Sequence, residues 1–342
     1  MKNTNKFKFA SLFSMLLILF CFYSCKKNTA QDSPKPKQGN SNDITSQKSF
    51  FSGFIATPKE ILDKLPKLNG DKIAITESIF PTTFSLRTPP IQNQGQTGTC
   101  VAWATTYCAW SIENLYRSKN TVYNTGVNVF SPGFIYNQLS ANCNTGISTA
   151  SALEALKNQG ACTYQTLPFS TDCSNNVTPL QRDSARLHRI ANVDYYVIDK
   201  ATRQNTALLK MLIYQKHPII FATAADDNMN TQPVWNRFGS PRFSYDGFLT
   251  PGNIGRNVPV GHHAMAIIGY DDNRHAFKVQ NSWGSAWGDA GFLWIDYDFF
   301  GSGQYLNAVL TYNNQFNTYG STWGFTVNDV ITEAYVISDI PQ

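Results

Sequence analysis

Residues 279–288 read VQNSWGSAWG, which is the most distinctive stretch of the chain. An Asn-Ser pair is followed there by two Trp-Gly pairs. An Asn-Ser pair alone predicts only a turn, because both side chains can hydrogen-bond to the nearby backbone. The stretch therefore has to be interpreted together with two other segments that precede it in the sequence.

The first of these segments, residues 92–103, reads QNQGQTGTCVAW. A polar, glycine-rich loop leads into good helix formers over 102–115, with Cys100 at the junction. The unpaired N–H groups and the positive dipole end of a helix stabilise a thiolate at such a position. Taken alone, a cysteine at a helix start is more often a small buried hydrophobic residue.

The second segment, residues 261–270, reads GHHAMAIIGY. Its histidines open an apolar run that is typical of a strand, and the polar residues 271–273 predict a turn after it. A lone histidine at such a strand start is more often structural than catalytic.

Taken in the order in which they occur along the chain, the three segments resemble the motifs of the papain-like cysteine peptidases. In that family, one cysteine acts with a distant His and Asn. Further matches are Ser131-Pro132 and the CNTG stretch at 143–146, before a predicted helix over 149–158. The resemblance extends from about residue 84 to residue 295. It implies an α+β fold of two domains: a helical domain that bears the nucleophile helix, an antiparallel β-barrel-like domain, and an active-site cleft between them.

The resemblance also implies a role for each matching residue. Cys100 corresponds to the nucleophile, and His263 corresponds to the general acid and base because it directly precedes the Ala-x-Ala strand. Asn281 corresponds to the residue that orients the imidazole, and Trp283 would shield the His–Asn hydrogen bond from water. Gln94 corresponds to the side-chain donor of the oxyanion hole.

Substrate contacts follow from the same resemblance. Gly146 matches a backbone position that pairs with an extended substrate, while Ala222 and Ala264 would line the pocket for a side chain near the scissile bond. The implied partners are protein or peptide substrates, and neither a cofactor nor a metal is expected. The adjacent acids at 226–227 lack His or Cys neighbours at metal-ligand spacing, so we interpret them as solvated.

The predicted function is that of a cysteine peptidase, expected to be an endopeptidase, which acts through a Cys-His-Asn triad and a thioester acyl-enzyme. Two alternatives stay open. The fold could serve as a catalytically silent binding module, or the same triad could transfer an acyl group to an amine. The chain has a residue for each of the four catalytic roles, and this favours the peptidase, because a binding role requires none of them. The four residues are Cys100, His263, Asn281 and Gln94.

The cysteines depart from the family pattern. Thr97 stands where the family has one half of a disulfide, so Cys143 loses its usual partner. Cys108, Cys143, Cys162 and Cys173 allow three pairings. A bond between Cys162 and Cys173 is the simplest of these, because it closes a short loop, and buried free thiols are a further alternative.

The N-terminus predicts export. Three lysines precede an uncharged, largely apolar run over 9–24, which is too short to span a bilayer and is typical of a signal peptide. The following Cys25 and its surroundings resemble a bacterial lipoprotein signal, which implies a signal peptide at 1–24, a lipid on Cys25 and a flexible polar tether at 25–48. The expected location is the bacterial cell envelope, periplasmic or at the cell surface, with membrane attachment through the lipid.

Charge argues against nucleic-acid binding. The formal net charge is +5, with 28 basic and 23 acidic residues, but residues 1–48 contain eight of the lysines and two of the acids. The remaining 20 basic and 21 acidic residues leave the globular part nearly neutral, whereas nucleic-acid binding needs an excess of positive charge on the folded domain. The oligomeric state stays open.

The remaining chain divides into three expected parts. Residues 49–81 form a short extension or propeptide-like segment, with a short helix whose N-cap is Thr57 and whose first residue is Pro58. Residues 82–185 form the helical domain and 186–342 the β-rich domain. In the latter, an apolar stripe over 208–213 predicts a helix, 218–223 a buried strand, and 225–260 a long connection that shapes the cleft or decorates the surface.

Overall fold

The computed structural model describes residues 53–70, 80–140, 142–173, 176–189, 194–226, 259–297, 300 and 331–338. The predicted signal peptide, the tether with Cys25, and nearly all of the connection at 225–260 lie outside the described residues. Residues 48–342 form one compact unit. None of the helices in the described part of the chain is both long and apolar enough to cross a bilayer.

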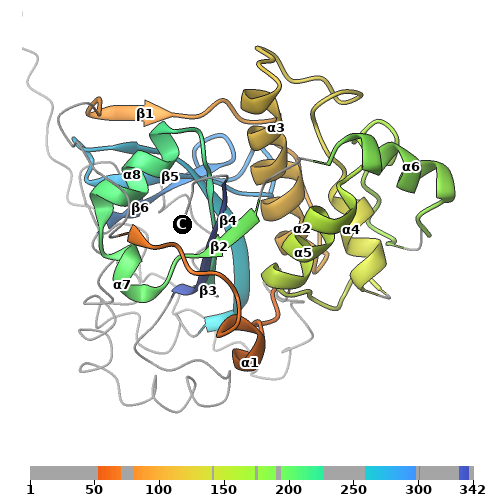
Figure 1. The fold of residues 1–342 in the computed structure, drawn as a ribbon, viewed down its shortest axis with the longest axis horizontal. Helices are drawn as coiled ribbons and strands as arrows, with labels where there is room; N and C mark the ends of the chain where they lie inside the picture. The colour runs from red at the N-terminus through yellow and green to blue at the C-terminus, as the bar shows by residue number, and fades with distance from the viewer. Residues whose placement is uncertain are drawn as a thin grey trace, which may run out of the picture. The chain divides into compact units, whose positions relative to one another are not determined.

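An antiparallel sheet forms the centre of this unit (Figure 1). Its strands follow the spatial order β2 (Asp194–Val197), β7 (Ile331–Ser338), β3 (Ile219–Asp226), β4 (Pro259–Asp271), β5 (Ala276–Gln280) and β6 (Phe292–Asp296). A further strand, β1 (Thr83–Ser85), pairs with the far end of β4. The predicted buried strand at 218–223 is confirmed as the first part of β3.

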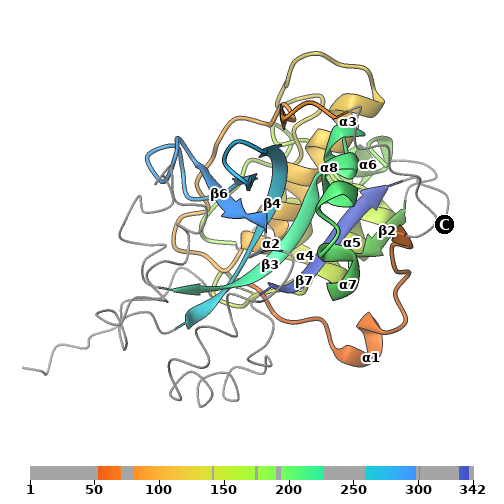
Figure 2. The same ribbon diagram turned by 90° about the vertical axis from the view of Figure 1, so that its left-hand side faces the viewer.

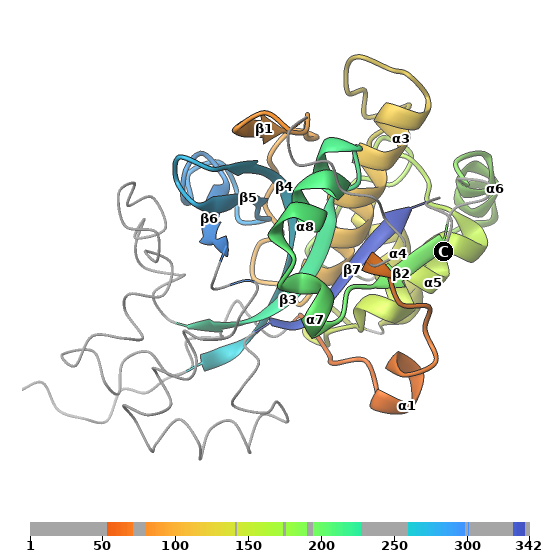
Figure 3. The same cartoon turned by 60° about the vertical axis from the view of Figure 1, so that its left-hand side comes forward.

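Helices cover both faces of the sheet (Figures 2 and 3). One layer contains the consecutive helical segments α2 (Cys100–Ala102), η3 (Trp103–Trp110) and α3 (Ser111–Arg117), together with α4 (Pro132–Leu139), α5 (Thr149–Gln159) and α6 (Pro179–Leu187). The opposite face is covered by α7 (Lys200–Arg203) and α8 (Thr206–Tyr214). This combination of helices and an antiparallel sheet confirms the expected α+β class.

Strand alternation divides the core between the two faces. Along β3, Ile219 and Phe221 pack with the residues around α8, whereas Ile220 and Ala222 pack with the layer of α2, α4 and α5. Successive side chains of a strand point to opposite faces, so this sheet can be buried on both sides only if β3 is apolar throughout. The first half of β3, Ile219–Ala222, meets that condition.

Side-chain caps set the starts of the main helices. The Ser131 hydroxyl accepts a hydrogen bond from the N–H of Phe134 at the start of α4, and the Ser148 hydroxyl accepts one from the N–H of Ser151 at the start of α5. Each cap satisfies an N–H that lacks a partner within the helix. The predicted helix over 149–158 is confirmed as α5.

The N-terminal segment, defined here as residues 53–70, runs along the outside of this fold and contains the short helix α1 (Lys59–Leu62), visible in Figure 3. Residue 54 pairs with Ile147 at one end of the segment, and Lys67 pairs with Val197 of β2 near the other. The predicted start of the helix was wrong by one residue, because Pro58 is the N-cap. The N–H and the hydroxyl of Thr57 donate instead to the carboxylate of Glu333.

Candidate active site

Cys100 is the first residue of the long helical stretch formed by α2, η3 and α3. The loop before it turns at Gly98, whose N–H donates to the carbonyl of Cys143 at 2.6 Å. The Cys100 side chain is fully buried and belongs to the cluster that also contains Ala264 of β4. The helix start and the middle of β4 therefore meet at this cysteine.

His263 and Asn281 form the second part of the site. The imidazole Nε2 lies 2.7 Å from Asn281 Oδ1, and both side chains are buried. Because an amide oxygen only accepts, this contact assigns the proton of the neutral ring to Nε2 and leaves Nδ1 as the basic nitrogen. Trp283 stacks on the imidazole with ring centroids 4.5 Å apart. The structure thus brings together the three residues that the sequence motifs single out around the ring.

The backbone connects this pair to the cysteine. Ala264 follows His263 directly on β4, and the backbone of Ala264 hydrogen-bonds the Cys100 sulfur. Asn281 follows the end of β5, where its N–H donates to the carbonyl of Gly291 at 3.0 Å. Since β4 and β5 are neighbours in the sheet, their pairing fixes the position of His263 relative to Asn281.

Gln94 is completely buried between the nucleophile loop and the segment after β5. Its side-chain oxygen accepts a 2.5 Å hydrogen bond from the hydroxyl of Ser282, and its Nε2 donates to the carbonyl of Thr97 at 2.7 Å. A hydroxyl can bond to either end of an amide, but the Thr97 carbonyl can only accept, so these two bonds together orient the amide. Sequence reasoning missed Ser282, although its place beside Asn281 could have suggested a supporting role.

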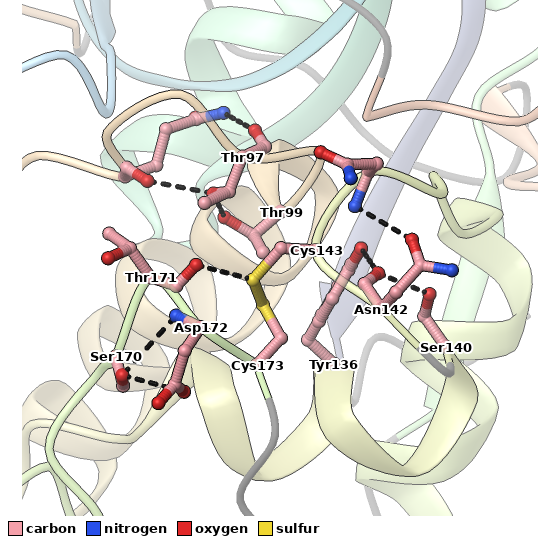
Figure 4. Close-up of a disulfide and its surroundings, with 12 residues drawn as sticks. Thr97, Thr99, Tyr136, Ser140, Asn142, Cys143, Ser170, Thr171, Asp172 and Cys173 are labelled. Carbon is pink, nitrogen blue, oxygen red and sulfur yellow. Dashed lines mark hydrogen bonds between the residues drawn. A yellow bond between two sulfur atoms is a disulfide. The ribbon is translucent and has the colours of Figure 1, made fainter.

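A disulfide joins Cys143 to Cys173, with Cα atoms 5.2 Å apart (Figure 4). The simplest sequence-based pairing, Cys162 with Cys173, was therefore wrong. Cys162 and Cys108 are buried free thiols. Cys143, whose usual family partner is replaced by Thr97, is bonded to Cys173 instead. The bond holds the loop that precedes Ile147 next to Thr97 and Thr99 of the nucleophile loop.

The predicted substrate-binding residues lie around the same cysteine. Ala222 and Ala264 are cross-strand partners on β3 and β4, and both are buried in the cluster with Cys100. Gly146, the residue expected to pair with substrate, is buried. In this structure the backbone of the next residue, Ile147, pairs with Phe54 of the N-terminal segment. Both alanines share this cluster with Phe54 of the N-terminal segment.

The N-terminal segment lies against Ile147 and Cys100. The N–H of Ile55 donates to the carbonyl of Ile147 at 3.1 Å, and the N–H of Ile147 donates to the carbonyl of Gly53 at 3.2 Å. The backbone of Gly53 hydrogen-bonds the Cys100 sulfur, and a Cβ atom at residue 53 would lie only 2.6 Å from that sulfur. A peptide of this chain thus covers the cysteine, and only glycine fits at the point of contact.

The neighbouring residues of the segment are anchored as well. Phe54 is buried in the cluster with Cys100, and its ring lies 5.8 Å from that of His262. The N–H and the hydroxyl of Thr57 both donate to the carboxylate of Glu333, at 2.5 and 2.9 Å. The hydroxyl of Tyr335 donates to the same carboxylate at 2.7 Å. Sequence reasoning gave no role to Gly53, Phe54 or Glu333.

Burial shifts the pKa values of the two catalytic candidates in opposite directions. Desolvation raises the pKa of the Cys100 thiol to about 12, although hydrogen bonds from the surrounding backbone oppose this. Desolvation lowers the pKa of His263 to about 4, and the bond to Asn281 opposes that shift. Near neutral pH the pair is therefore a thiol and a neutral imidazole. A helix start and an imidazolium favour a thiolate, but in this covered state burial acts in the opposite direction and is the larger effect on the pKa of Cys100.

The described residues contain no group of three or more His, Cys, Asp or Glu side chains arranged to hold a metal ion. The chemistry that the arrangement can support is therefore judged on the side chains themselves. A buried thiol at a helix start, an oriented imidazole and an oriented amide are the components of nucleophilic acyl transfer.

Comparison with known proteins agrees with this geometry. A family profile described as "Papain family cysteine protease" matches residues 80–312. The chain is 25% identical over 230 residues to the gamete and mating-type specific protein A of Dictyostelium discoideum, covering 67% of this chain and 44% of that protein. It is 24% identical over 312 residues to a cathepsin L-like proteinase of Phaedon cochleariae, covering 85% of each.

Solved structures show the same fold. Xylellain, a cysteine protease from Xylella fastidiosa, superposes with a TM-score of 0.58 at 17% identity, over 87% of this chain and all of that one. Procathepsin L2 from the larval midgut of Tenebrio molitor superposes with a TM-score of 0.51 at 19% identity, over 73% of each chain. The chain spans about half the length of some curated relatives, such as the 48% covered in the germination-specific cysteine protease 1 of Arabidopsis thaliana.

Proposed function

The chain belongs to the papain family of cysteine proteases, and we propose on this basis that it hydrolyses peptide bonds of protein or peptide substrates. The observation that carries the proposal is the 2.7 Å bond that orients His263 through Asn281, on the strand whose backbone contacts Cys100. We further propose that the protein is an endopeptidase, since an extended segment of its own chain lies across the cysteine and continues beyond it at 54–57.

The proposed reaction begins when the N-terminal segment leaves the cysteine. Water and substrate then reach the sulfur, and the proton moves from Cys100 to Nδ1 of His263, since the helix start stabilises the thiolate and Asn281 the imidazolium. The thiolate attacks the carbonyl carbon of the substrate. His263 then gives the proton to the departing amine, which leaves a thioester on Cys100. Finally, His263 accepts a proton from water, whose attack releases the acid and restores the thiol.

Gln94 is the proposed side-chain donor to the oxyanion that forms during both attacks, together with the backbone N–H of Cys100. In the covered structure its Nε2 donates to the carbonyl of Thr97, so the amide is already held in one orientation before substrate binds. Ser282 holds the other end of that amide. This makes Ser282 a positioning residue, which acts on the oxyanion through Gln94.

Substitution of Ser282 by alanine tests that role. We expect kcat to fall by about tenfold, a smaller loss than the roughly 100- to 1000-fold cost of removing an oxyanion donor itself, while KM changes little. Steady-state kinetics on a fluorogenic peptide would measure both constants. Ser282→Thr keeps the hydroxyl and should recover most of the rate, whereas an equal loss in both variants would indicate a packing effect and exclude the positioning role.

The N-terminal segment is the proposed inhibitor of the resting enzyme. Gly53 lies on the sulfur, Phe54 fills apolar space beside it, and Thr57 is held by Glu333. In this covered state, burial raises the pKa of the Cys100 thiol and lowers the pKa of His263, which favours the uncharged form of both groups. Activity then requires displacement or removal of the segment.

We also propose that the protein is a lipoprotein of the bacterial cell envelope, periplasmic or at the cell surface, attached to the membrane through Cys25. The support is the order of lysines, apolar run, small residue and cysteine at 1–25, followed by a polar tether. In an expressing bacterium, metabolic labelling with an alkyne fatty acid should mark the wild-type chain and leave Cys25→Ala unmarked. Equal labelling of both chains, or of neither, would exclude lipid attachment at this residue.

The peptidase proposal is tested by active-site labelling. A thiol-directed peptidyl epoxide should attach to Cys100 of the full chain, as identified by mass spectrometry, and should abolish hydrolysis of a panel of fluorogenic dipeptides in proportion to labelling. A protein that is labelled but hydrolyses nothing, while it incorporates an amine acceptor into the peptide, would instead be an acyl transferase. If the epoxide does not label Cys100 and no peptide is hydrolysed even after the N-terminal segment is displaced, the protein would be the catalytically silent binding module.

A further inference from the structure

Thr97 is a buried polar residue of the loop that precedes Cys100. It is only 6% exposed, and its hydroxyl donates a hydrogen bond to the carbonyl of Gln94 at 2.7 Å. The same hydroxyl lies 2.7 Å from the hydroxyl of Thr99 (Figure 4). A hydroxyl has one hydrogen and a carbonyl only accepts, so Thr99 is the donor in the second bond. The two threonines therefore form a directed chain of hydrogen bonds that ends on the backbone of Gln94.

Thr97 also holds the side chain of Gln94. The backbone carbonyl of Thr97 accepts a hydrogen bond from Gln94 Nε2 at 2.7 Å. An amide nitrogen carries two hydrogens, and this bond uses one of them. The second N–H is then the one that can point to the oxyanion of a substrate. Thr97 thus contacts Gln94 at two points, and the orientation of the Thr97 carbonyl decides where the second N–H points.

The loop around Thr97 depends on such anchors, because glycines lie two residues before it and one residue after it. Glycine populates more backbone conformations than other residues do. At the start of the loop, the N–H of Gln94 donates to the carbonyl of Ser282 at 2.8 Å, and at its end the N–H of Gly98 donates to the carbonyl of Cys143 at 2.6 Å. The hydroxyl of Thr97 connects the interior of the loop to its start.

Thr99 supports this arrangement instead of capping the helix. It is completely buried and is the N-cap of α2, yet its side chain makes no capping bond. A threonine N-cap ordinarily accepts a hydrogen bond from an N–H of the first helical turn. Here the hydroxyl donates to Thr97, while the N–H groups of Cys100 and Val101 hydrogen-bond the Cys100 sulfur. The threonine chain therefore serves the loop and leaves the helix start to the sulfur.

We propose that Thr97 is a positioning residue for the oxyanion: its hydroxyl fixes the loop so that its carbonyl holds the Gln94 amide with the second N–H directed at the oxyanion. This inference rests on the proposed peptidase function and adds a residue that supports its oxyanion donor. Thr97 is a position at which the chain departs from the family pattern, so the hydroxyl belongs to this sequence. Thr97 itself does not touch the substrate, and it acts only through Gln94.

Substitution of Thr97 by valine tests this role, because it removes the hydroxyl and keeps the carbonyl and the shape of the side chain. The background is the full-length Gly53→Ala chain, in which the N-terminal segment is expected to be displaced. We expect kcat on a fluorogenic peptide to fall by about tenfold, as for the loss of one hydrogen bond, while KM changes by less than about twofold. Thr97→Ser keeps the hydroxyl and should recover most of kcat.

Thr105 provides the matched control. It is completely buried, and its hydroxyl donates to the carbonyl of Val101 at 2.7 Å on the helical stretch that Cys100 begins. Thr105→Val therefore removes the same kind of bond without contact to Gln94, and it should keep kcat within about twofold. Thermal unfolding followed by circular dichroism compares the stability of the two variants. An equal loss of kcat in both would attribute the effect to packing and overturn the inference.

A second background shows whether Thr97 acts through Gln94. Gln94→Ala removes the oxyanion donor and should itself lower kcat by about 100- to 1000-fold. In that background Thr97→Val should cause no further loss, because the group that it positions is gone. A further tenfold loss would mean that Thr97 acts independently of Gln94, which overturns the inference and leaves the peptidase proposal intact.

A peptide aldehyde tests the inference without hydrolysis. The Cys100 sulfur adds to the aldehyde carbon, the carbon–oxygen double bond becomes single, and the oxygen takes the thiol proton, so the adduct places an oxygen where the oxyanion forms. Calorimetric titration should show affinity about tenfold weaker for Thr97→Val and unchanged for Thr97→Ser and Thr105→Val. The effect of Thr97→Val should be absent in the Gln94→Ala background.

The aldehyde also separates the inference from the proposed reaction. The expected pattern of aldehyde affinities without peptide hydrolysis by any Cys100-containing chain supports the positioning role and overturns the peptidase proposal. Hydrolysis of peptides together with aldehyde affinities that Thr97→Val does not alter overturns the positioning role alone. Absence of both hydrolysis and aldehyde binding overturns both.

Discussion

Replacement of Cys100 by alanine should abolish peptide hydrolysis. Loss of the nucleophile from a triad lowers kcat by about a millionfold, because His263 and Asn281 cannot act without it. The substitution removes one buried atom next to Gly53, so the fold and the seating of the N-terminal segment should persist. The measurement is hydrolysis of a fluorogenic peptide by full-length chains, in the wild-type background and with Gly53→Ala, together with circular dichroism.

The controls for this result are the other two buried thiols. Cys108 donates to the side-chain oxygen of Gln280 at 3.2 Å, and Cys162 is buried in the cluster with Cys100. Cys108→Ala and Cys162→Ala should keep the activity within a few-fold, since neither sulfur begins the nucleophile helix. Substantial hydrolysis by Cys100→Ala would contradict the proposed mechanism, and an equal loss in all three variants would attribute the effect to packing.

Much of the site could be predicted from the sequence because its residues are joined by local structure. The helix that starts at Cys100, the strand through His263 and the turn at Asn281 each follow from a short segment with its own pattern. Cross-strand pairing between β4 and β5 then brings the last two together. The apolar strand at 218–223 and the helix at 149–158 were likewise predictable, since their length, composition and caps are local signals.

The parts that sequence reasoning missed depend on contacts between distant residues. Thr57 precedes a proline and was expected to cap α1, yet its donors go to Glu333, which nothing in the local pattern indicates. The disulfide between Cys143 and Cys173 depends on how two loops pack, and spacing alone favours the shorter loop. Burial raises the pKa of Cys100, although hydrogen bonds from the surrounding backbone, that of Gly53 among them, lower it, so the helix-start argument alone does not give the pKa of the buried thiol.

The same contacts connect stability with activity. The segment that covers Cys100 buries Phe54 and satisfies Glu333, so it stabilises the folded resting state. In the proposed mechanism, a substrate competes with this segment for the backbone of Ile147. The apparent affinity for substrate is therefore reduced by the fraction of molecules in which the segment is seated.

Substitution of Gly53 by alanine should activate the full-length protein. The added Cβ would lie 2.6 Å from the Cys100 sulfur and 2.7 Å from the carbonyl carbon and oxygen of Gly98. The backbone at Gly98 cannot move freely, because its N–H is bonded to Cys143. Overpacking of this kind costs about 1 to 3 kcal/mol, which shifts the ratio of unseated to seated segment by about 5- to 150-fold.

Two measurements report this shift independently. The rate of iodoacetamide labelling at Cys100, followed by mass spectrometry of the labelled peptide, should rise by that factor near neutral pH, because an uncovered sulfur regains water and its thiol pKa falls. Peptide hydrolysis should rise in parallel. Gly133→Ala is the matched control, since a Cβ there meets its nearest atom at an ordinary 3.5 Å and lies on α4.

A second variant separates displacement from local damage. Thr57→Val keeps Gly53 and removes one donor to Glu333, so it should also loosen the segment and raise both rates, by a smaller factor. Because residue 57 lies away from the sulfur, its effect can reach Cys100 only through the segment. Labelling and hydrolysis that stay at the level of Gly133→Ala in both variants would mean that the segment braces the fold without inhibiting the enzyme.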